Sequence, residues 1–330
     1  MTRIDSPFPA VLLSTLGLLV FPWLALGQEI PGITPPGGAA ATLLKDGFGF
    51  TEGPAAHPDG SVYFTDLPSE TIHVWTPDGQ VKQLRDKTGR ANGLAFDASG
   101  RLVACEMNHG RLTATGSDGV AAVLVSMFQG KPFNQTNDLV MDPLGGIYFS
   151  DPYYGPERSL PQDRMAVYYL KPGTDMAERV VDKGPAKPNG VLLSPDAKTL
   201  YVIDSENPTV WCFQIGEGGA LSPAGDMGKF TDLKLPEGKT SGGDGGAVDS
   251  KGNLYITSEL GIQVIAADGK HLGIIAIPQQ PANCAFFGPE LKSLFVTART
   301  AIYKVDLLVP GLRLPLAKPA EGPSTSQNGD

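Results

Sequence analysis

The sequence predicts an all-β protein, a six-bladed β-propeller of four-stranded blades. Three observations support this prediction: an abundance of turn-forming residues, a repeat of roughly 45 residues, and apolar strand-like runs on both sides of each turn. The chain has 330 residues, of which 41 are Gly and 29 are Pro, spread along its whole length. So many helix breakers disfavour long helices and indicate short strands joined by tight turns.

One pattern recurs six times along the chain. Each copy begins with a residue that carries a side-chain oxygen, and continues through a short apolar strand, a turn and a second apolar strand. The copies begin at Glu52, Asn92, Asn137, Asn189, Asp244 and Asn283. A second hairpin follows in most copies, which gives four strands per copy. The sixth copy has only three obvious strands, so we expect residues 41–45 to supply its fourth strand and close the ring.

The first 27 residues resemble a secretory signal peptide. Arg3 precedes an apolar run over residues 10–21, and small residues stand before Gln28, where cleavage is expected. A retained membrane anchor is the alternative, because residues 8–27 are nearly long enough to span a bilayer. We expect cleavage, and therefore a periplasmic or secreted protein that has no membrane contact afterwards.

The rest of the chain is expected to form one catalytic propeller domain over residues 41–312. Residues 28–40 contain three Pro and three Gly and are expected to be a linker. Residues 313–330 are expected to be a flexible tail. Neither segment has enough apolar residues for packing to be expected.

Composition excludes one class of partner. The chain has 26 Lys and Arg against 35 Asp and Glu, a net charge of −9. A nucleic-acid binder, which needs a basic face, is therefore not expected. No pattern implies a protein partner. Cys105, Cys212 and Cys284 lie far apart in apolar runs without metal spacing, and permit at most one disulfide or three buried thiols.

The first residue of each repeat is a candidate ligand. In a propeller this position heads the innermost strand, so six oxygen-bearing side chains converge on one end of the central channel. Turn formation by Asn and Asp is the simpler explanation, but it accounts poorly for Glu52 and for six such residues in six copies. Without an ion, Glu52 and Asp244 would place like charges in a confined pocket. Oxygens without sulfur or imidazole suit a hard divalent cation, Ca²⁺ first, with Zn²⁺, Mg²⁺ or Mn²⁺ as alternatives.

A second ring of residues, four of the six acidic, is expected at the same mouth. It lies where the second strand of each repeat returns to that face, and consists of Asp66, Glu106, Asp151, Asp204, Ser258 and Ala298. Tyr153 and Tyr154 follow Asp151 directly. Contact with substrate and the ordinary polarity of hairpin loops are both open explanations for these residues.

Four short stretches, in phase with the repeat, are similar to those of a known family. They are Thr51-Glu52-Gly53-Pro54, Thr136-Asn137-Asp138-Leu139, Pro188-Asn189-Gly190 and Gly243-Asp244-Gly245. The chain resembles the gluconolactonase and senescence marker protein (regucalcin)-like propellers. These are calcium-dependent lactonases related to the squid-type phosphofluoridate hydrolase and, more distantly, to paraoxonases.

The resemblance implies a role for several residues. Glu52, Asn189 and Asp244 are expected to bind the metal, and Asn137 to complete the shell or hold the substrate. Asp244 is also the expected proton acceptor and donor. Some animal members carry Arg two residues before the Asn137 position; Gln135 stands here, which leaves the polar contacts to the substrate open.

The expected reaction is hydrolysis of a small sugar lactone such as glucono-1,5-lactone to the aldonic acid. A metal-polarised carbonyl and Asp244 as general base and acid would carry it. The substrate contacts are expected from Asn137, Asn92, Asn283, Asp151 and Tyr153. Two alternatives stay open: another metal-dependent ester or organophosphate hydrolase of the same fold, and a non-enzymatic propeller that binds a partner at its mouth.

Overall fold

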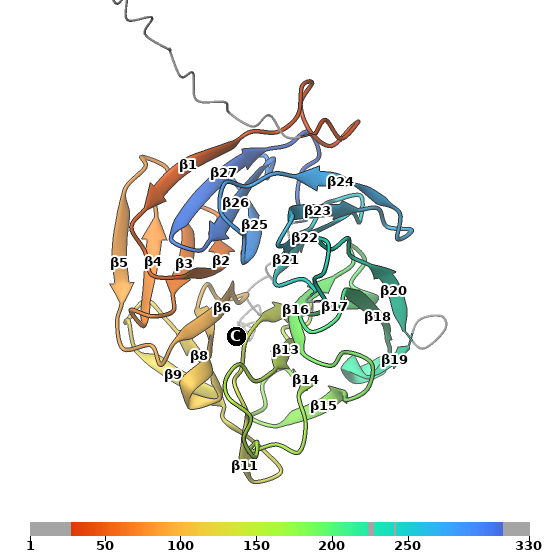
Figure 1. Cartoon of the computed structure of the whole chain (residues 1–330). Coiled ribbons are helices and arrows are strands. Elements are labelled where there is room, and N and C mark those ends of the chain that lie inside the picture. Colours follow the sequence, from red (N-terminus) through yellow and green to blue (C-terminus); the bar gives the residue numbers. More distant parts are fainter. Residues whose placement is uncertain (1–27, 224–227, 241, 313–330) are drawn as a thin grey trace, which may run out of the picture.

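The computed structural model describes residues 28–223, 228–240 and 242–312. Six antiparallel sheets stand radially around a central axis, which confirms the predicted six-bladed propeller (Figure 1). The predicted signal peptide and C-terminal tail lie outside the described residues. Within the described residues, no helix is long and apolar enough to cross a membrane.

Each of the first three blades is a meander of four strands that runs from the axis outwards. Blade 1 consists of β2 (Thr51–Ala56), β3 (Val62–Asp66), β4 (Thr71–Trp75) and β5 (Val81–Arg85). Blade 2 consists of β6 (Ala91–Phe96), β7 (Leu102–Glu106), β8 (Arg111–Thr115) and β9 (Ala121–Val125). Blade 3 consists of β12 (Leu139–Met141), β13 (Ile147–Asp151), β14 (Ala166–Leu170) and β15 (Ala177–Val181).

The other three blades follow the same plan. Blade 4 consists of β16 (Pro188–Leu193), β17 (Thr199–Asp204), β18 (Thr209–Ile215) and two short strands on β18, β19 (Leu221–Pro223) and β20 (Lys229–Asp232). Blade 5 consists of β21 (Gly246–Val248), β22 (Leu254–Ser258), β23 (Gly261–Ile265) and β24 (His271–Ile275). Blade 6 consists of β25 (Asn283–Phe287), β26 (Ser293–Ala298), β27 (Ala301–Asp306) and β1 (Ala41–Asp46).

Three small elements lie outside this plan. A hairpin of β10 (Met127–Phe128) and β11 (Lys131–Pro132) precedes blade 3. Single 3-10 turns, η1 (Met107–His109) and η2 (Glu217–Gly219), complete the described elements.

The N-terminal strand closes the ring, as predicted. β1 pairs antiparallel with β27, with Ala41 opposite Val305 and Asp46 opposite Ala301. The outermost strand of blade 6 thus comes from the start of the domain and its three inner strands from the end (Figure 1). This pairing covers the edge of β27, whose unpaired N–H and C=O groups would otherwise be open to other chains.

Burial falls from the axis outwards. All six residues of β16 are buried, whereas the three central residues of the outermost strand β5 are exposed. Apolar side chains of neighbouring blades pack face to face, as between blades 2 and 3, where Cys105 lies in one cluster with Phe149 and Tyr168. All three cysteines are buried, and none of them forms a disulfide within the described residues.

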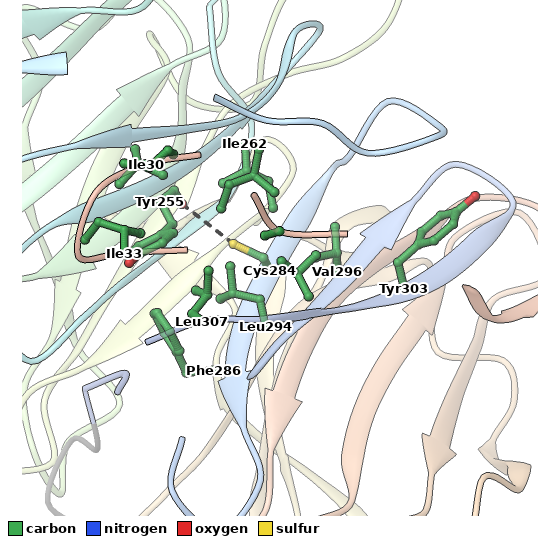
Figure 2. Close-up of a cluster of buried hydrophobic side chains, with 14 of the residues drawn as sticks. Ile30, Ile33, Tyr255, Ile262, Cys284, Phe286, Leu294, Val296, Tyr303 and Leu307 are labelled. Carbon is green, nitrogen blue, oxygen red and sulfur yellow. Dashed lines mark hydrogen bonds between the residues drawn. The ribbon is translucent and has the colours of Figure 1, made fainter. Parts of the chain in front are cut away.

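The expectation that residues 28–40 do not pack is wrong. Ile30 and Ile33 are only 1% and 4% exposed and belong to the core between blades 5 and 6. Figure 2 shows both side chains beside Tyr255 of blade 5, with Leu307, which follows β27, in the same cluster. The physical reason is that a few well-spaced apolar residues suffice when they fill an existing seam between two sheets.

Backbone contacts fix this segment in place. The N–H of Leu308 donates to the carbonyl of Ile33 at 2.8 Å, and the N–H of Ile30 donates to the Thr34 hydroxyl at 2.8 Å. A Cβ atom on Gly273 of β24 would lie 2.6 Å from Ile30, so the glycine makes room for the isoleucine. Residues 28–40 are therefore part of the domain.

We predict that Ile30→Ala lowers the free energy of unfolding by about 2–4 kcal/mol, because it leaves a cavity in the seam between blades 5 and 6. Urea denaturation of purified protein measures this change. The matched control is Leu43→Ala on β1, whose side chain is 51% exposed and whose loss is expected to change stability by less than about 0.5 kcal/mol. Equal effects of the two substitutions would contradict the packing of Ile30 in this seam.

Candidate active site in the central channel

The six residues that begin the repeats stand at the start of the innermost strands, and the side chains of Glu52, Asn189, Asp244 and Asn283 lie close to one another. These six, the ring residues, are Glu52, Asn92, Asn137, Asn189, Asp244 and Asn283, and all are buried except Asp244, which is half-buried. Backbone hydrogen bonds join neighbouring blades at this level. The N–H of Gly93 donates to the Asn137 carbonyl at 2.8 Å, and that of Gly190 donates to the Asp244 carbonyl at 3.0 Å.

Glycine at the next position allows this close approach. A Cβ atom on Gly53 would lie 1.9 Å from the Asn92 carbonyl oxygen, and one on Gly245 would lie 2.1 Å from the Asn283 side chain. Gly53 also has φ of +46°, a conformation that other residues rarely adopt. Any larger residue would push the innermost strands apart, so these glycines hold the ring residues together.

Blade 3 departs from the glycine pattern and supplies a third carboxylate. Asp138 stands where four other blades have glycine, and its side chain crosses toward blade 2, since a Cβ atom on Gly93 would lie 2.7 Å from its Oδ1. The N–H of Leu139 donates to this oxygen at 2.9 Å. No role for Asp138 was expected from the sequence; the break in the glycine pattern is the signal that could have identified it.

The amide of Asn189 links the ring to the rim. Its Nδ2 donates to Asp244 Oδ1 at 2.5 Å and to the Tyr154 hydroxyl at 2.7 Å. Both amide hydrogens are thereby used, which leaves Asn189 Oδ1 as the atom available to a cation. Asn189 and Asp244, predicted as ligands from blades 4 and 5, are thus in direct contact.

Burial and mutual repulsion disfavour ionisation of the channel carboxylates. The pKa of Glu52 lies well above its ordinary value, first because of burial and next because of the charge of Asp244. Burial raises the pKa of Asp138 to about 7, with a further contribution from Asp244. Burial also raises the pKa of Asp244 to about 6, although the Asn189 hydrogen bond and the positive charge of Arg299 act in the opposite direction.

This donor set fits a hard divalent cation. Among the described residues, no three His, Cys, Asp or Glu side chains are grouped as a metal site by themselves. The candidate set instead combines two carboxylates, Glu52 and Asp244, with the amide oxygens of Asn189 and Asn137, and oxygen-only sets of this kind suit calcium. A cation there would also relieve the repulsion that raises the carboxylate pKa values.

The other predicted amides, Asn92, Asn137 and Asn283, are buried at the start of the innermost strands. Asn283 Oδ1 accepts the Cys284 N–H at 2.8 Å, and the Asn92 amide donates to the Met107 sulfur at 3.6 Å. The sulfur is a weak acceptor, so the amide of Asn92 can exchange it for a ligand oxygen at little cost. Asn92, Asn137 and Asn283 therefore stay candidates for substrate contact.

Asp151 is not available to a substrate. Its side chain is fully buried, and its two oxygens accept the backbone N–H groups of Asn134 and Gln135, each at 2.9 Å. In blades 1 and 4, Asp66 and Asp204 bind the corresponding pair of N–H groups in the same way. The prediction of a substrate contact for Asp151 is wrong, because this position anchors the loop that leads into the innermost strand.

Tyr154, and not its neighbour Tyr153, reaches the ring. The Tyr154 hydroxyl bonds to Asn189 and to Ser205 Oγ at 2.7 Å, and its N–H donates to Gln135 Oε1 at 2.6 Å. Tyr153 lies under the guanidinium of Arg158, 4.5 Å from ring centroid to Cζ. The two residues belong to one loop, 152–165, and successive side chains of an extended chain point to opposite sides. Tyr154, and not the predicted Tyr153, is therefore the tyrosine that contacts a ring residue.

A cavity of about 310 Å³ continues along the channel on the other side of the ring. It begins at Asp138 and Asn283, and its walls are largely apolar, including Leu94, Val191 and Phe287. Such walls offer few groups for acid–base or electrophilic chemistry. The polar mouth with Glu52 and Asp244 is therefore the candidate active site.

The chain is similar to several known lactonases. The chain is 28% identical over 277 residues to a gluconolactonase from Zymomonas mobilis, which covers 78% of each chain. It is 29% identical over 254 residues to a pentonolactonase from Haloferax volcanii, covering 74% of this chain and 80% of that protein. A solved gluconolactonase from Xanthomonas campestris is 31% identical, with a TM-score of 0.75 over 86% of this chain and 97% of its own.

A family match covers most of the propeller. Residues 50–300 match the SMP-30/Gluconolactonase/LRE-like region, a span that runs from the loop before Glu52 to the turn after β26. This agrees with the resemblance drawn from the four short stretches around Glu52, Asn137, Asn189 and Asp244. The chain belongs to the SMP-30/gluconolactonase/LRE-like family.

Proposed function

We propose that this protein is a metal-dependent lactonase that hydrolyses sugar lactones such as glucono-1,5-lactone to the aldonic acid. The observation that carries the proposal is the direct contact of Asn189 with Asp244 at the mouth where Glu52 also converges. Relatives that are named gluconolactonase and pentonolactonase support hydrolysis of a sugar lactone. The oxygen-only donor set supports calcium as the cation.

Among the predicted ligands, Glu52 and Asp244 would supply negative charge, and Asn189 would supply an amide oxygen in a fixed orientation. Glu52 and Asp244 would hold the cation through carboxylate oxygens, and Asn189 through its Oδ1, whose orientation is set by the two hydrogen bonds of its amide nitrogen. When bound, the cation would polarise the lactone carbonyl and stabilise the negative charge that develops on its oxygen.

Asp244 is the proposed general base and acid. Of the two candidate carboxylate ligands it is the more exposed. Asp244 is half-buried, whereas Glu52 is only 3% exposed, so water can reach Asp244. Its carboxylate would accept a proton from the attacking water and return it to the departing ring oxygen. Asn189 donates to Oδ1, which can also face the cation, and leaves Oδ2 for this transfer.

The polar residues around the mouth would orient the sugar. Asn137, Asn92 and Asn283 offer amide groups on three sides of the channel, and the Tyr154 hydroxyl stands at the rim beside Asn189. Several hydrogen-bonding groups in fixed positions suit a polyhydroxylated ring, since each hydroxyl can donate and accept.

The same metal centre would also suit another ester or an organophosphate. A phosphoester or organophosphate would use the same cation and base, and only the contacts to its remaining groups would differ. The amide-rich wall of Asn92, Asn137 and Asn283 favours the polyhydroxylated sugar lactone over an apolar ester, because an apolar group would leave these amides without partners.

We predict that Asp244→Asn abolishes turnover of glucono-1,5-lactone and leaves the fold intact, because the amide is isosteric but cannot accept the proton. Initial rates from pH-indicator assays, corrected for spontaneous hydrolysis, measure the loss, and circular dichroism measures the fold. The control is Asp97→Asn on the turn at the far end of β6, where no effect on the rate is expected. Full activity of Asp244→Asn would refute the proposed base.

We predict that calcium raises Tm more at pH 8 than at pH 5. The carboxyl groups of Glu52, Asp138 and Asp244 have raised pKa values in the folded protein, so their ionisation destabilises the metal-free fold as the pH rises from about 4 through about 7. A cation restores that loss, and at pH 5 protons compete with it for the carboxylates.

Thermal unfolding with a chelator and with calcium at each pH checks this expectation. Glu52→Gln removes one candidate ligand and should reduce the calcium-induced shift at pH 8. If the calcium-induced shift in Tm has the same size at both pH values, or if it is unchanged in Glu52→Gln, the calcium site must lie elsewhere.

A further inference from the structure

Arg299 is a cation at the rim of the channel mouth. It lies in the two-residue turn that joins β26 to β27, on the face where the ring residues begin the innermost strands. Its carbonyl accepts the N–H of Thr51 at 2.7 Å. Thr51 directly precedes Glu52 in blade 1, so the Arg299 backbone lies next to the start of that strand. The Arg299 side chain is exposed.

Two contacts hold the guanidinium in one orientation. The face of the group lies over the Phe50 ring, with Cζ 5.0 Å from the centroid, and Nη2 donates to Gln280 Oε1. The turn itself is anchored, because the N–H of Thr300 donates to Gln279 Oε1 at 3.0 Å. A long side chain that is already ordered loses less conformational entropy when it binds a ligand.

The rest of the guanidinium has no partner within residues 28–223, 228–240 and 242–312. Arg299 forms none of the salt bridges found there, in contrast to Arg85 and Arg111, which both bind Glu106. Its only side-chain hydrogen bond in that part of the chain goes to Gln280. Because arginine has five N–H donors, most donors of this exposed side chain stay open to a ligand.

The guanidinium of Arg299 lies close to the candidate metal ligands without pairing with them. The turn that carries it lies at the mouth, because the Arg299 carbonyl binds the N–H of Thr51, the residue directly before Glu52. Among the described residues Arg299 forms no ion pair with Glu52, Asp138 or Asp244, so its positive charge is available to a further anion at the rim. An arginine fork of this kind recognises carboxylate, phosphate and sulfonate groups.

We propose that Arg299 binds an anionic group of the substrate, so that the preferred substrates are sugar lactones that carry a phosphate, sulfonate or carboxylate away from the ring carbonyl. This inference rests on the proposed lactonase function and narrows its substrate class. The carbonyl end of the substrate would lie at the ring, and Arg299 at the rim would hold the anionic end.

The test compares glucono-1,5-lactone with its 6-phosphate, using calcium-loaded protein at low salt. We expect the wild type to favour the 6-phosphate in kcat/KM. Arg299→Gln should lower that preference by about 10- to 100-fold, because it removes charge-assisted hydrogen bonds. Arg299→Lys keeps the charge but loses the fork, so an intermediate preference is expected.

The control for net charge is Arg101→Gln. Arg101 pairs with Asp97 in the turn at the far end of β6, away from the mouth. Its removal should leave the preference for the 6-phosphate unchanged. If Arg299→Gln lowers kcat/KM for both lactones by the same factor, Arg299 affects only Asp244 or the structure of the turn. That result, or an unchanged kcat/KM for both lactones, overturns the inference.

Equilibrium binding separates this inference from the proposed function. The stable acids gluconate and 6-phosphogluconate are titrated into wild type and Arg299→Gln. Tighter binding of the phosphorylated acid that is lost in Arg299→Gln supports the anion site even if neither lactone is hydrolysed, in which case only the proposed reaction fails. Equal affinity of the wild type for the two acids overturns the anion site.

Discussion

The close approach of six innermost strands at the channel axis is the constraint on which the site depends. The strands can meet there only because Gly53, Gly93, Gly190 and Gly245 have no side chains to keep them apart. The residue before each glycine therefore stands at the axis, at the start of an innermost strand. A fold made of ordinary hairpins thus brings together polar groups that are about 40 to 50 residues apart in the sequence.

Crowding has an electrostatic consequence. Glu52, Asp138 and Asp244 share a confined space, and both burial and repulsion favour their protonated forms. The protein tolerates this in part through hydrogen bonds, such as that from Asn189 to Asp244. Unfavourable carboxylate pairs of this kind are typical of sites that bind a cation or move a proton, which is why the mouth and not the apolar cavity below it is the candidate active site.

The features that follow the repeat could be predicted from the sequence. The spacing of the apolar runs predicted where each blade begins. The Glu, Asn or Asp before each run identified the ring residues, among them Asn189 and Asp244, which are in contact. The missing strand in the last repeat predicted closure by the N-terminal segment, now β1, because a ring cannot leave an edge unpaired.

Features set by individual side chains could not be predicted in this way. Whether Tyr153 or Tyr154 faces the ring depends on the path of loop 152–165, which no periodic pattern fixes. The burial of Asp151 depends on two N–H groups of a neighbouring loop. The packing of Ile30 depends on a seam between blades that exists only after the sheets have assembled.

The most direct test of the metal-dependent reaction is proton release from glucono-1,5-lactone, corrected for spontaneous hydrolysis, on protein stripped with a chelator and then supplied with calcium. The proposed mechanism predicts that the enzymatic rate vanishes on chelation and returns when calcium is added. An enzymatic rate that persists without any divalent cation would contradict it, because Glu52, Asn189 and Asp244 would then have no ion to hold in the reaction.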